Sequence, residues 1–327
     1  YSHQIIANQF DKSNPEPSSE ITQSQQSFSK RFMIVTADKR ASLTARAILL
    51  AGGNALDAAI AAQNVLSVVE PQSSGLGGGG FLLFFNNIDK KVYAYDGRET
   101  SSSLVKDDMY LINNNKMQFI EAVQEPFSVG VPGLYTMLAD AHNKFGILNW
   151  EKLFISAIQY SEGFKVGERL NKLLNWAPHI KKNRFVNDTY FNKGEAKKIG
   201  SLIQNLELKE SLKILSKNPY SINKGILAKK ISKRLDYKLS LNDLQKWETI
   251  EREPLCKLIN SYKICGFPPP TSGGIGLIQI IGILNNKKNF INDIDPHLPM
   301  HLFIEASRLA YQDRNLYVTD PLFFDVP

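Results

Sequence analysis

Apolar residues in the first third of the chain form two helical patterns and then two short strands. The segments 42–50 and 55–69 are rich in small and apolar residues, and a Gly-Gly pair separates them. The second is apolar on almost every side, which predicts a buried helix that ends before Pro71. The apolar runs 81–85 and 92–95 are too short for helices and predict strands.

The middle of the chain has mainly helical periodicity. An extended segment is expected over 127–132, followed by a Pro-Gly turn and a helix over 134–142. Residues 150–250 are predicted to be mostly helical. The amphipathic segments of this region cover 151–161, 196–208 and 226–235. We interpret the region as a helical cover.

The last third returns to strands and then to helices. A hairpin is predicted over 255–267, a buried helix from Ile275 and an amphipathic helix over 300–316. Strands separated by small-residue helices, a helical insertion and a hairpin together predict a layered α/β (α+β) fold. The chain contains no internal repeat.

The two cysteines lie on the two arms of the predicted hairpin. Pairing Ile259 with Tyr262 places Cys256 opposite Cys265 at a non-hydrogen-bonded position. Cα atoms of such pairs lie about 4.5 Å apart, which is within reach of a disulfide. A register slipped by one residue would leave two free thiols in different environments. The disulfide and the free thiols are therefore alternatives.

Length, composition and charge narrow the possible classes of protein. A chain of 327 residues with 43% hydrophobic residues can fill a core and predicts a folded protein. The net charge of +7 is spread along the sequence, and its lysine pairs have no interleaved aromatic residues. We interpret these pairs as solvated faces and expect no nucleic-acid partner. No apolar run reaches the roughly 18 to 20 residues of a membrane span.

The N-terminal segment differs in composition from the rest. The chain opens at Tyr1 without an initiator Met, and residues 1–31 are rich in Ser, Gln, Asn and Pro without periodicity. We expect a processed chain in which residues 1–31 are a flexible remnant and residues 32–327 are the folded part.

A run of four glycines, Gly77 to Gly80, stands directly before the first predicted strand. With Gly75 it matches the pattern G-x-G-x-x-G, which binds dinucleotides where a strand enters the loop and a helix leaves it. Here a helix enters and a strand leaves, so no helix N-terminus faces a pyrophosphate. We therefore expect close backbone packing near a substrate or catalytic centre.

Arg98 is the sharpest candidate for ligand binding. It follows the second predicted strand, with Asp96 and Glu99 beside it. A guanidinium at a strand end can bind a carboxylate with two parallel hydrogen bonds. The alternative is a structural salt bridge to its own acidic neighbours.

Three residues spaced by four are a candidate metal site. His297, His301 and Glu305 would stack on one helix as metal ligands. Pro299 disfavours a continuous helix through both histidines, so capping and surface pairing are the simpler interpretation.

Eleven short blocks, taken in order, closely resemble the gamma-glutamyltransferases (gamma-glutamyl transpeptidases). The resemblance runs from about Phe32 to Pro327. The blocks are Gly52–Ala59, Pro71-Gln72, Gly77–Phe81, Asp96–Glu99, Val131–Gly133, Arg252–Pro254, Pro268–Gly274, Glu305-Ala306, Ala310-Tyr311, Asp313-Arg314 and Asp320-Pro321.

The resemblance implies a fold and a subunit organisation. The family has the four-layer αββα sandwich of the N-terminal nucleophile (Ntn) hydrolases and is made as one precursor that cleaves itself. This chain is similar to the large-subunit portion of a single Ntn-hydrolase domain over 32–327. The partner implied is a small subunit whose N-terminal threonine is the nucleophile, so no catalytic residue is expected in this chain.

The resemblance also implies the chemistry and the ligands. It implies attack on the gamma-glutamyl amide of glutathione or a related compound and transfer of the glutamyl group to water, an amino acid or a dipeptide. By the same resemblance Arg98 binds the α-carboxylate of the glutamyl group, and no metal or cofactor is used. Family habit, with the missing Met, favours a periplasmic or secreted protein.

Two other activities remain possible at this point. One is a related Ntn acylase that takes glutaryl or cephalosporin-type side chains, because Arg98 does not exclude other acids. The other is a non-catalytic, carboxylate-binding chain.

Overall fold

The computed structural model describes residues 26–286 and 297–326. Most of the predicted remnant over 1–31 therefore lies outside the described residues. The chain divides into two compact units, each built from two separate stretches of sequence. Unit 1 comprises residues 1–79 and 98–248, and unit 2 comprises residues 80–97 and 249–327. The predicted single domain over 32–327 stays a prediction.

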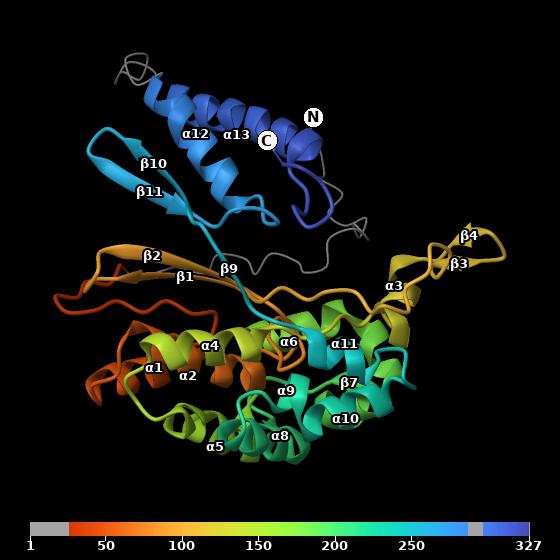
Figure 1. The fold of residues 1–327 in the computed structure, drawn as a ribbon. Helices are drawn as coiled ribbons and strands as arrows, with labels where there is room; N and C mark the ends of the chain where they lie inside the picture. Colours follow the sequence, from red (N-terminus) through yellow and green to blue (C-terminus); the bar gives the residue numbers. More distant parts are fainter. Residues whose placement is uncertain (1–25, 287–296, 327) are drawn as a thin grey trace, which may run out of the picture. The chain divides into compact units, whose positions relative to one another are not determined.

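Unit 1 is mainly helical (Figure 1). Its α-helices are α1 (Lys39–Leu50), α2 (Ala55–Val69), α3 (Phe119–Ala122), α4 (Leu134–Phe145), α5 (Ile155–Glu162), α6 (Glu168–Trp176), α7 (Arg184–Tyr190), α8 (Leu206–Lys217), α9 (Ser221–Lys224), α10 (Ile226–Arg234) and α11 (Leu241–Lys246). Short 3-10 helices form at η1 (Pro126–Ser128), η2 (Trp150–Phe154) and η3 (Pro178–Lys182).

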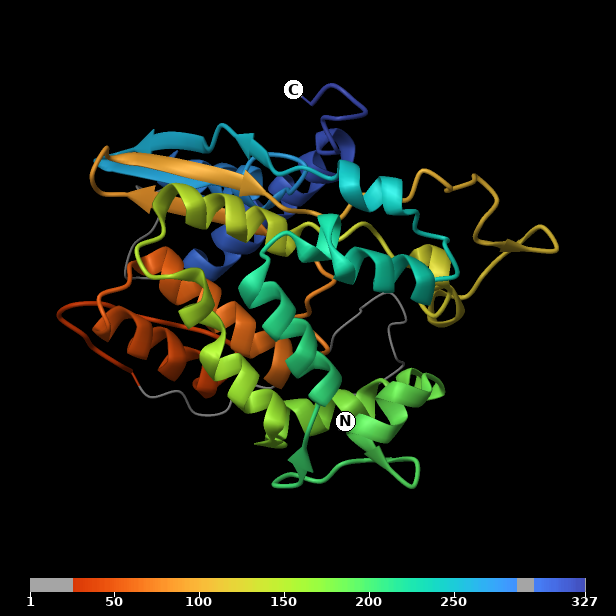
Figure 2. The same ribbon diagram turned by 60° about the horizontal axis from the view of Figure 1, so that its bottom comes forward.

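Two-residue strands complete unit 1. They are β3 (Leu111–Ile112), β4 (Asn115–Lys116), β5 (Phe164–Lys165), β6 (Phe191–Asn192), β7 (Glu195–Ala196) and β8 (Leu202–Ile203). Figures 1 and 2 both show the β3–β4 hairpin projecting from the end of unit 1 that lies away from α1 and α2.

Helix α2 lies at the centre of the unit 1 core. The side chains of Leu56, Ile60 and Val65 are fully buried, as the almost wholly apolar sequence predicts. Its first turn is fixed by a capping box, in which Asn54 Oδ1 accepts from the Asp57 amide and Asp57 Oδ2 accepts from the Asn54 amide.

One buried polar cluster ties α2 to two neighbouring elements. The Tyr135 hydroxyl on α4 donates a 2.8 Å hydrogen bond to Asn64 Oδ1, and Asn64 Nδ2 donates to the Leu153 carbonyl at 3.0 Å. Burial raises the pKa of the Tyr135 hydroxyl, so it stays protonated and able to donate. The cluster fixes the register of α2 against α4 and η2.

In its described residues, unit 2 combines antiparallel strands with two helices. Its three-stranded sheet has the order β1-β2-β9, and a separate two-stranded sheet is the β10–β11 hairpin. Figure 1 shows the hairpin beside α12, and α12 beside α13. The elements are β1 (Phe81–Asn86), β2 (Lys91–Asp96), β9 (Ile250–Arg252), β10 (Leu255–Ile259), β11 (Tyr262–Gly266), α12 (Gly273–Asn286) and α13 (Leu298–Tyr317).

The start of α12 packs directly on the end of β11. A Cβ atom on Gly274 would lie 2.9 Å from the carbonyl carbon of Gly266 and 3.0 Å from the amide nitrogen of Phe267. Real Cβ atoms do not approach backbone so closely, so the contact requires glycine at this position.

Most predicted elements are confirmed. Helix α2 spans the predicted residues 55–69, and the predicted strands and hairpin appear within one residue of their expected ends. Helix α1 starts three residues earlier than expected because Asp38 caps it and accepts from the Arg40 amide.

Two predicted elements are wrong. The expected helix over 196–208 is instead β7, β8 and the first turn of α8, because Gly200 has a φ of +83° and Asn205 caps α8. The extended segment over 127–132 begins as the 3-10 turn η1, since Pro126 favours a helical start. Only Val131 forms a β-bridge there, with Thr100.

No helix in the described part of the chain combines the length and apolar character that a bilayer crossing needs.

Candidate functional site

Arg98 emerges directly from the end of β2. Strands β1 and β2 pair as far as Phe81 opposite Asp96, and Gly80 and Gly97 extend the ladder by two reciprocal backbone hydrogen bonds of 3.1 and 2.9 Å. Arg98 follows at once, and it is exposed. The expectation that it stands at a strand end is confirmed.

Unit 1 holds the backbone that carries Arg98. The Trp247 indole Nε1 donates a 3.3 Å hydrogen bond to the Arg98 carbonyl oxygen. Two residues on, the Thr100 carbonyl accepts from the Val131 amide at 2.8 Å. An exposed guanidinium on a backbone fixed in this way is suited to bind a carboxylate through two parallel hydrogen bonds.

The glycine run makes room for Glu99. A Cβ atom on Gly79 would collide with the Glu99 carboxylate and lie 2.7 Å from the Glu99 amide nitrogen. The Gly78 carbonyl accepts from the amides of Gly133 and Leu134 at 3.3 and 3.2 Å, at the start of α4. The loop leads from α2 into β1, the order in which no helix N-terminus faces a phosphate. The predicted close packing is confirmed.

A buried acid anchors the beginning of the same loop. Glu70, which caps the C-terminal end of α2, accepts hydrogen bonds from Arg169 Nε at 2.8 Å and Gln72 Nε2 at 2.6 Å. Burial raises the pKa of Glu70, and the Arg169 guanidinium and Gln72 amide oppose this shift. The Glu70 carbonyl accepts from the amides of Ser73 and Ser74, so the chain leaves α2 along one fixed path.

In unit 2, Asp96 forms a buried ion pair with Arg252. Arg252 Nε donates a 2.8 Å hydrogen bond to Asp96 Oδ2, and the two side chains are 14% and 5% exposed. Arg252 Nη2 is buried and has no hydrogen-bond partner among the described residues.

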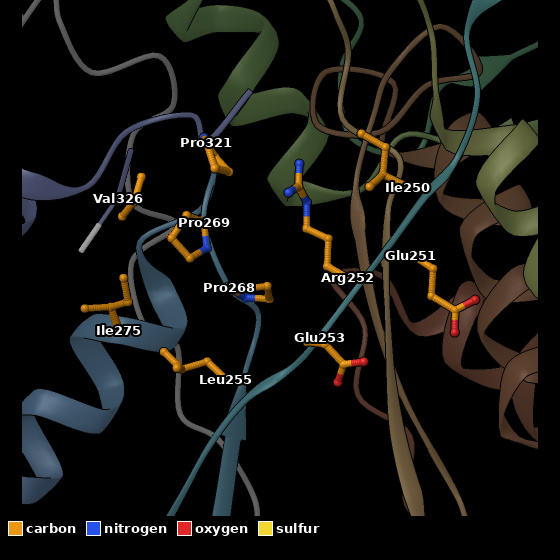
Figure 3. Close-up of a pocket in the computed structure, with 10 residues that line it drawn as sticks. All are labelled: Ile250, Glu251, Arg252, Glu253, Leu255, Pro268, Pro269, Ile275, Pro321 and Val326. Carbon is orange, nitrogen blue, oxygen red and sulfur yellow. The ribbon is translucent and has the colours of Figure 1, made fainter. Parts of the chain in front are cut away.

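Figure 3 shows Arg252 pointing among residues that line a cavity of 610 Å³, while Glu251 extends from the other side of the strand. The walls are mostly apolar, with Pro268, Pro269 and Ile275 on one side.

The two cysteines form a disulfide. Cys256 and Cys265 face each other in the β10–β11 register, their Cα atoms are 4.1 Å apart, and their sulfurs are bonded. The predicted register around Asn260-Ser261 is confirmed, and the alternative of two free thiols is wrong.

The three residues considered for a metal do not share one helix. His297 caps the start of α13, whereas His301 and Glu305 lie within it, and Pro299 occupies the first turn. Among the described residues no group of His, Cys, Asp or Glu is arranged to hold a metal ion.

Sequence reasoning missed two residues, Trp247 at the Arg98 carbonyl and Arg252 at the Asp96 carboxylate. The sequence pattern gives Trp247 no role, and Arg252 stands out only as part of a resembling block. No strand is predicted at 250–252, so the sequence pattern carries no sign that this cation faces a buried carboxylate.

Comparison with known proteins matches almost the whole chain. The family model Gamma-glutamyltranspeptidase covers residues 41–327. A glutathione hydrolase proenzyme of Bacillus subtilis (strain 168) is 33% identical over 301 residues, which are 90% of this chain and 51% of the relative. The chain therefore spans about half the length of the curated relatives it matches.

Solved structures show the same fold. A gamma-glutamyltranspeptidase from Pseudomonas nitroreducens, solved with L-DON, matches with a TM-score of 0.81 and 29% identity, over 90% of this chain and 88% of that one. The Helicobacter pylori gamma-glutamyltranspeptidase matches with a TM-score of 0.84 and 26% identity, over 93% and 88%. The predicted fold class, the large-subunit portion of the αββα Ntn-hydrolase sandwich, is confirmed.

Proposed function

Because the chain belongs to the gamma-glutamyltranspeptidase family, we propose that it is the large subunit of an autoprocessed gamma-glutamyltransferase, or glutathione hydrolase. The observation that carries the proposal is Arg98, exposed at the end of β2 on a backbone held by Trp247. Curated relatives of about twice the matched length are named as proenzymes, which supports a precursor cut into two subunits.

The proposed reaction is acyl transfer in two steps. The hydroxyl oxygen of an N-terminal threonine on the small subunit attacks the gamma-carbonyl of glutathione or a related compound. The free α-amine of the same threonine takes the hydroxyl proton as the ester bond forms. The amide C–N bond then breaks, and the leaving amine receives that proton from the α-amine. Water, an amino acid or a dipeptide then attacks the ester and releases the threonine. Under this proposal the chain supplies no nucleophile.

The role proposed for this chain is recognition of the glutamyl group. The α-carboxylate would accept two parallel hydrogen bonds from the Arg98 guanidinium, which lysine cannot offer. Glu99, seated on Gly79, adds a negative charge beside Arg98 and favours a ligand that also carries an ammonium group. An α-amino acid end satisfies both, whereas a plain glutaryl group satisfies only Arg98. This observation disfavours the acylase alternative.

We also propose that the protein works in a periplasm or outside the cell. The Cys256–Cys265 disulfide supports this location, because disulfides persist in oxidising compartments and are rare in the cytosol.

Two measurements test the proposed function. The N-terminus of any chain that co-purifies with this one should be threonine if the partner carries the nucleophile. Without an acceptor, a gamma-glutamyl anilide should only be hydrolysed. When a dipeptide acceptor is added, transfer to the dipeptide should appear as well. Turnover of a glutaryl anilide at equal or higher rate would favour the acylase, and no turnover of either would favour a non-catalytic chain.

A further inference from the structure

Trp247 reaches Arg98 across a long stretch of sequence. Its indole N–H donates to the Arg98 carbonyl oxygen at 3.3 Å, and the two residues are 149 positions apart in the sequence. The contact lies wholly within unit 1. Trp247 is the C-cap residue of α11 and is only 6% exposed. The donor is therefore held in place while the arginine side chain that it supports stays exposed.

Helix α11 contacts the segment 98–102 at a second point. The buried Ser102 hydroxyl lies 3.1 Å from Asp243 Oδ2 and 2.9 Å from the Lys238 carbonyl oxygen. Asp243 is also the capping-box residue of α11, paired with Ser240. One short helix thus contacts residues 98 and 102, the two ends of a five-residue segment.

Helix α11 is itself fixed to the unit 1 core. The side-chain amide of Asn223, which is fully buried, donates to the Leu244 carbonyl on α11 at 3.3 Å and to the Pro132 carbonyl at 2.9 Å. Asn223 Oδ1 accepts from the Thr136 hydroxyl on α4 at 2.7 Å. Rotation of α11 would break these buried hydrogen bonds, so the helix is a rigid support.

The backbone between β2 and Thr100 has no strand or helix of its own. The Thr100–Val131 bridge is its next regular contact after the Gly80–Gly97 pair. A ligand-binding side chain on such a segment needs support from elsewhere, because a binding group must be held within about 0.5 Å of its productive geometry.

We propose that Trp247 is a positioning residue for ligand binding by Arg98. Its indole N–H fixes the Arg98 carbonyl and therefore the backbone from which the Arg98 side chain extends. From this fixed position the guanidinium reaches the α-carboxylate. This inference rests on the proposed function, and it concerns the placement of Arg98 rather than the chemical step.

The test compares two tryptophan-to-phenylalanine variants of the enzyme assembled with its small subunit. Trp247→Phe keeps the ring and removes the N–H. Trp150→Phe is the matched control, because Trp150 is 8% exposed and its indole donates to the Leu215 carbonyl at 3.0 Å, also within unit 1. Both variants should lower the melting temperature by similar amounts.

Only Trp247→Phe should weaken substrate binding. We expect its KM for a gamma-glutamyl anilide to rise about tenfold with kcat within about twofold, since lost placement of a binding group acts on binding. In an Arg98→Ala background the same substitution should change kcat/KM no further, because the supported side chain is gone. A KM for Trp247→Phe equal to that of Trp150→Phe would overturn the proposal.

A second readout does not depend on turnover. Hydrogen exchange of the Val131 amide, which donates to Thr100, should speed up about tenfold or more in Trp247→Phe and stay unchanged in Trp150→Phe. Unchanged exchange in both variants would show that the indole does not hold the segment, and would overturn the inference. Absence of gamma-glutamyl turnover in the wild-type enzyme would instead remove the proposed function.

Discussion

Asp96 and Arg252 are joined by a 2.8 Å hydrogen bond in unit 2, between the end of β2 and the last residue of β9. Both side chains are largely buried, and the strand register places Ala94 opposite Arg252. Removing one partner of such a pair leaves an uncompensated buried charge. Arg252→Ala should therefore lower the free energy of unfolding by about 3 to 5 kcal/mol, measured by urea titration.

The double variant Asp96→Leu/Arg252→Met separates charge from packing. It removes both charges and keeps much of the volume, so we expect its stability to lie within about 1 to 2 kcal/mol of the wild type. If it were as unstable as Arg252→Ala, packing and not the unpaired charge would explain the loss.

Arg98 should matter for binding and little for folding. It is exposed, so Arg98→Ala should leave the melting temperature nearly unchanged. Loss of a charge-assisted hydrogen bond of about 1.5 to 3 kcal/mol predicts a KM for glutathione about 10 to 150 times higher. Arg98→Lys should not restore it, because the planar fork is lost. A wild-type KM in the lysine variant would contradict the assignment.

Gly274 should not tolerate a side chain. The Cβ atom of Gly274→Ala would press on Gly266 and Phe267, and we expect a loss of about 1 to 3 kcal/mol in thermal or urea unfolding. Gly276 lies two residues further along α12, and no atom lies within 4 Å of its added Cβ position. Gly276→Ala is the matched control and should be neutral or stabilising by up to about 1 kcal/mol.

Reduction of the disulfide should destabilise the β10–β11 hairpin. Cys256 and Cys265 are nine residues apart. A disulfide that closes a loop of this length lowers the conformational entropy of the unfolded chain, which contributes about 2 to 3 kcal/mol to the free energy of unfolding. The melting temperature should fall when a reductant is added. The variant Cys256→Ser/Cys265→Ser should melt at that lower temperature with or without reductant, and a response of this variant would point to another target of the reductant.

Acid should loosen α11 through Asp243. Burial acts to raise the pKa of Asp243, but hydrogen bonds from Ser103 and Ser240 outweigh it and hold the pKa below the usual value of 3.8. A carboxyl with a lowered pKa in the folded state stabilises the fold above its unfolded pKa. That stability is lost as the pH falls through the lower folded value. The melting temperature should therefore fall less steeply between pH 6 and about pH 2 for Asp243→Asn than for the wild type.

Local signals in the sequence account for the elements that were predicted well. Helix α2 has a capping residue at Asn54 and Pro71 just beyond its end, so both bounds could be placed. The hairpin register followed from the Asn260-Ser261 turn, and it also predicted which cysteines face each other. In each case the determining residues lie within a few positions of the element.

The support of Arg98 could not be predicted because it depends on distant residues. Trp247 donates to a main-chain carbonyl, and any residue could supply that acceptor, so Arg98 carries no sign of the contact. The close contact of Glu99 with Gly79 likewise joins two positions that are too far apart in the sequence for a local pattern to link them. The predicted helix over 196–208 was wrong for the opposite reason. Its apolar spacing is helical, but Gly200 turns the chain within the segment.

The chain passes between its two units three times, at 79/80, 97/98 and 248/249. As a result, no single cut releases either unit, and a fragment that ends before β9 would leave β2 with an unpaired edge. Neither unit can be expressed alone as one continuous fragment of the natural sequence. A separable version would need a rearranged gene in which residues 80–97 are joined by a new linker to 249–327, and residues 1–79 to 98–248.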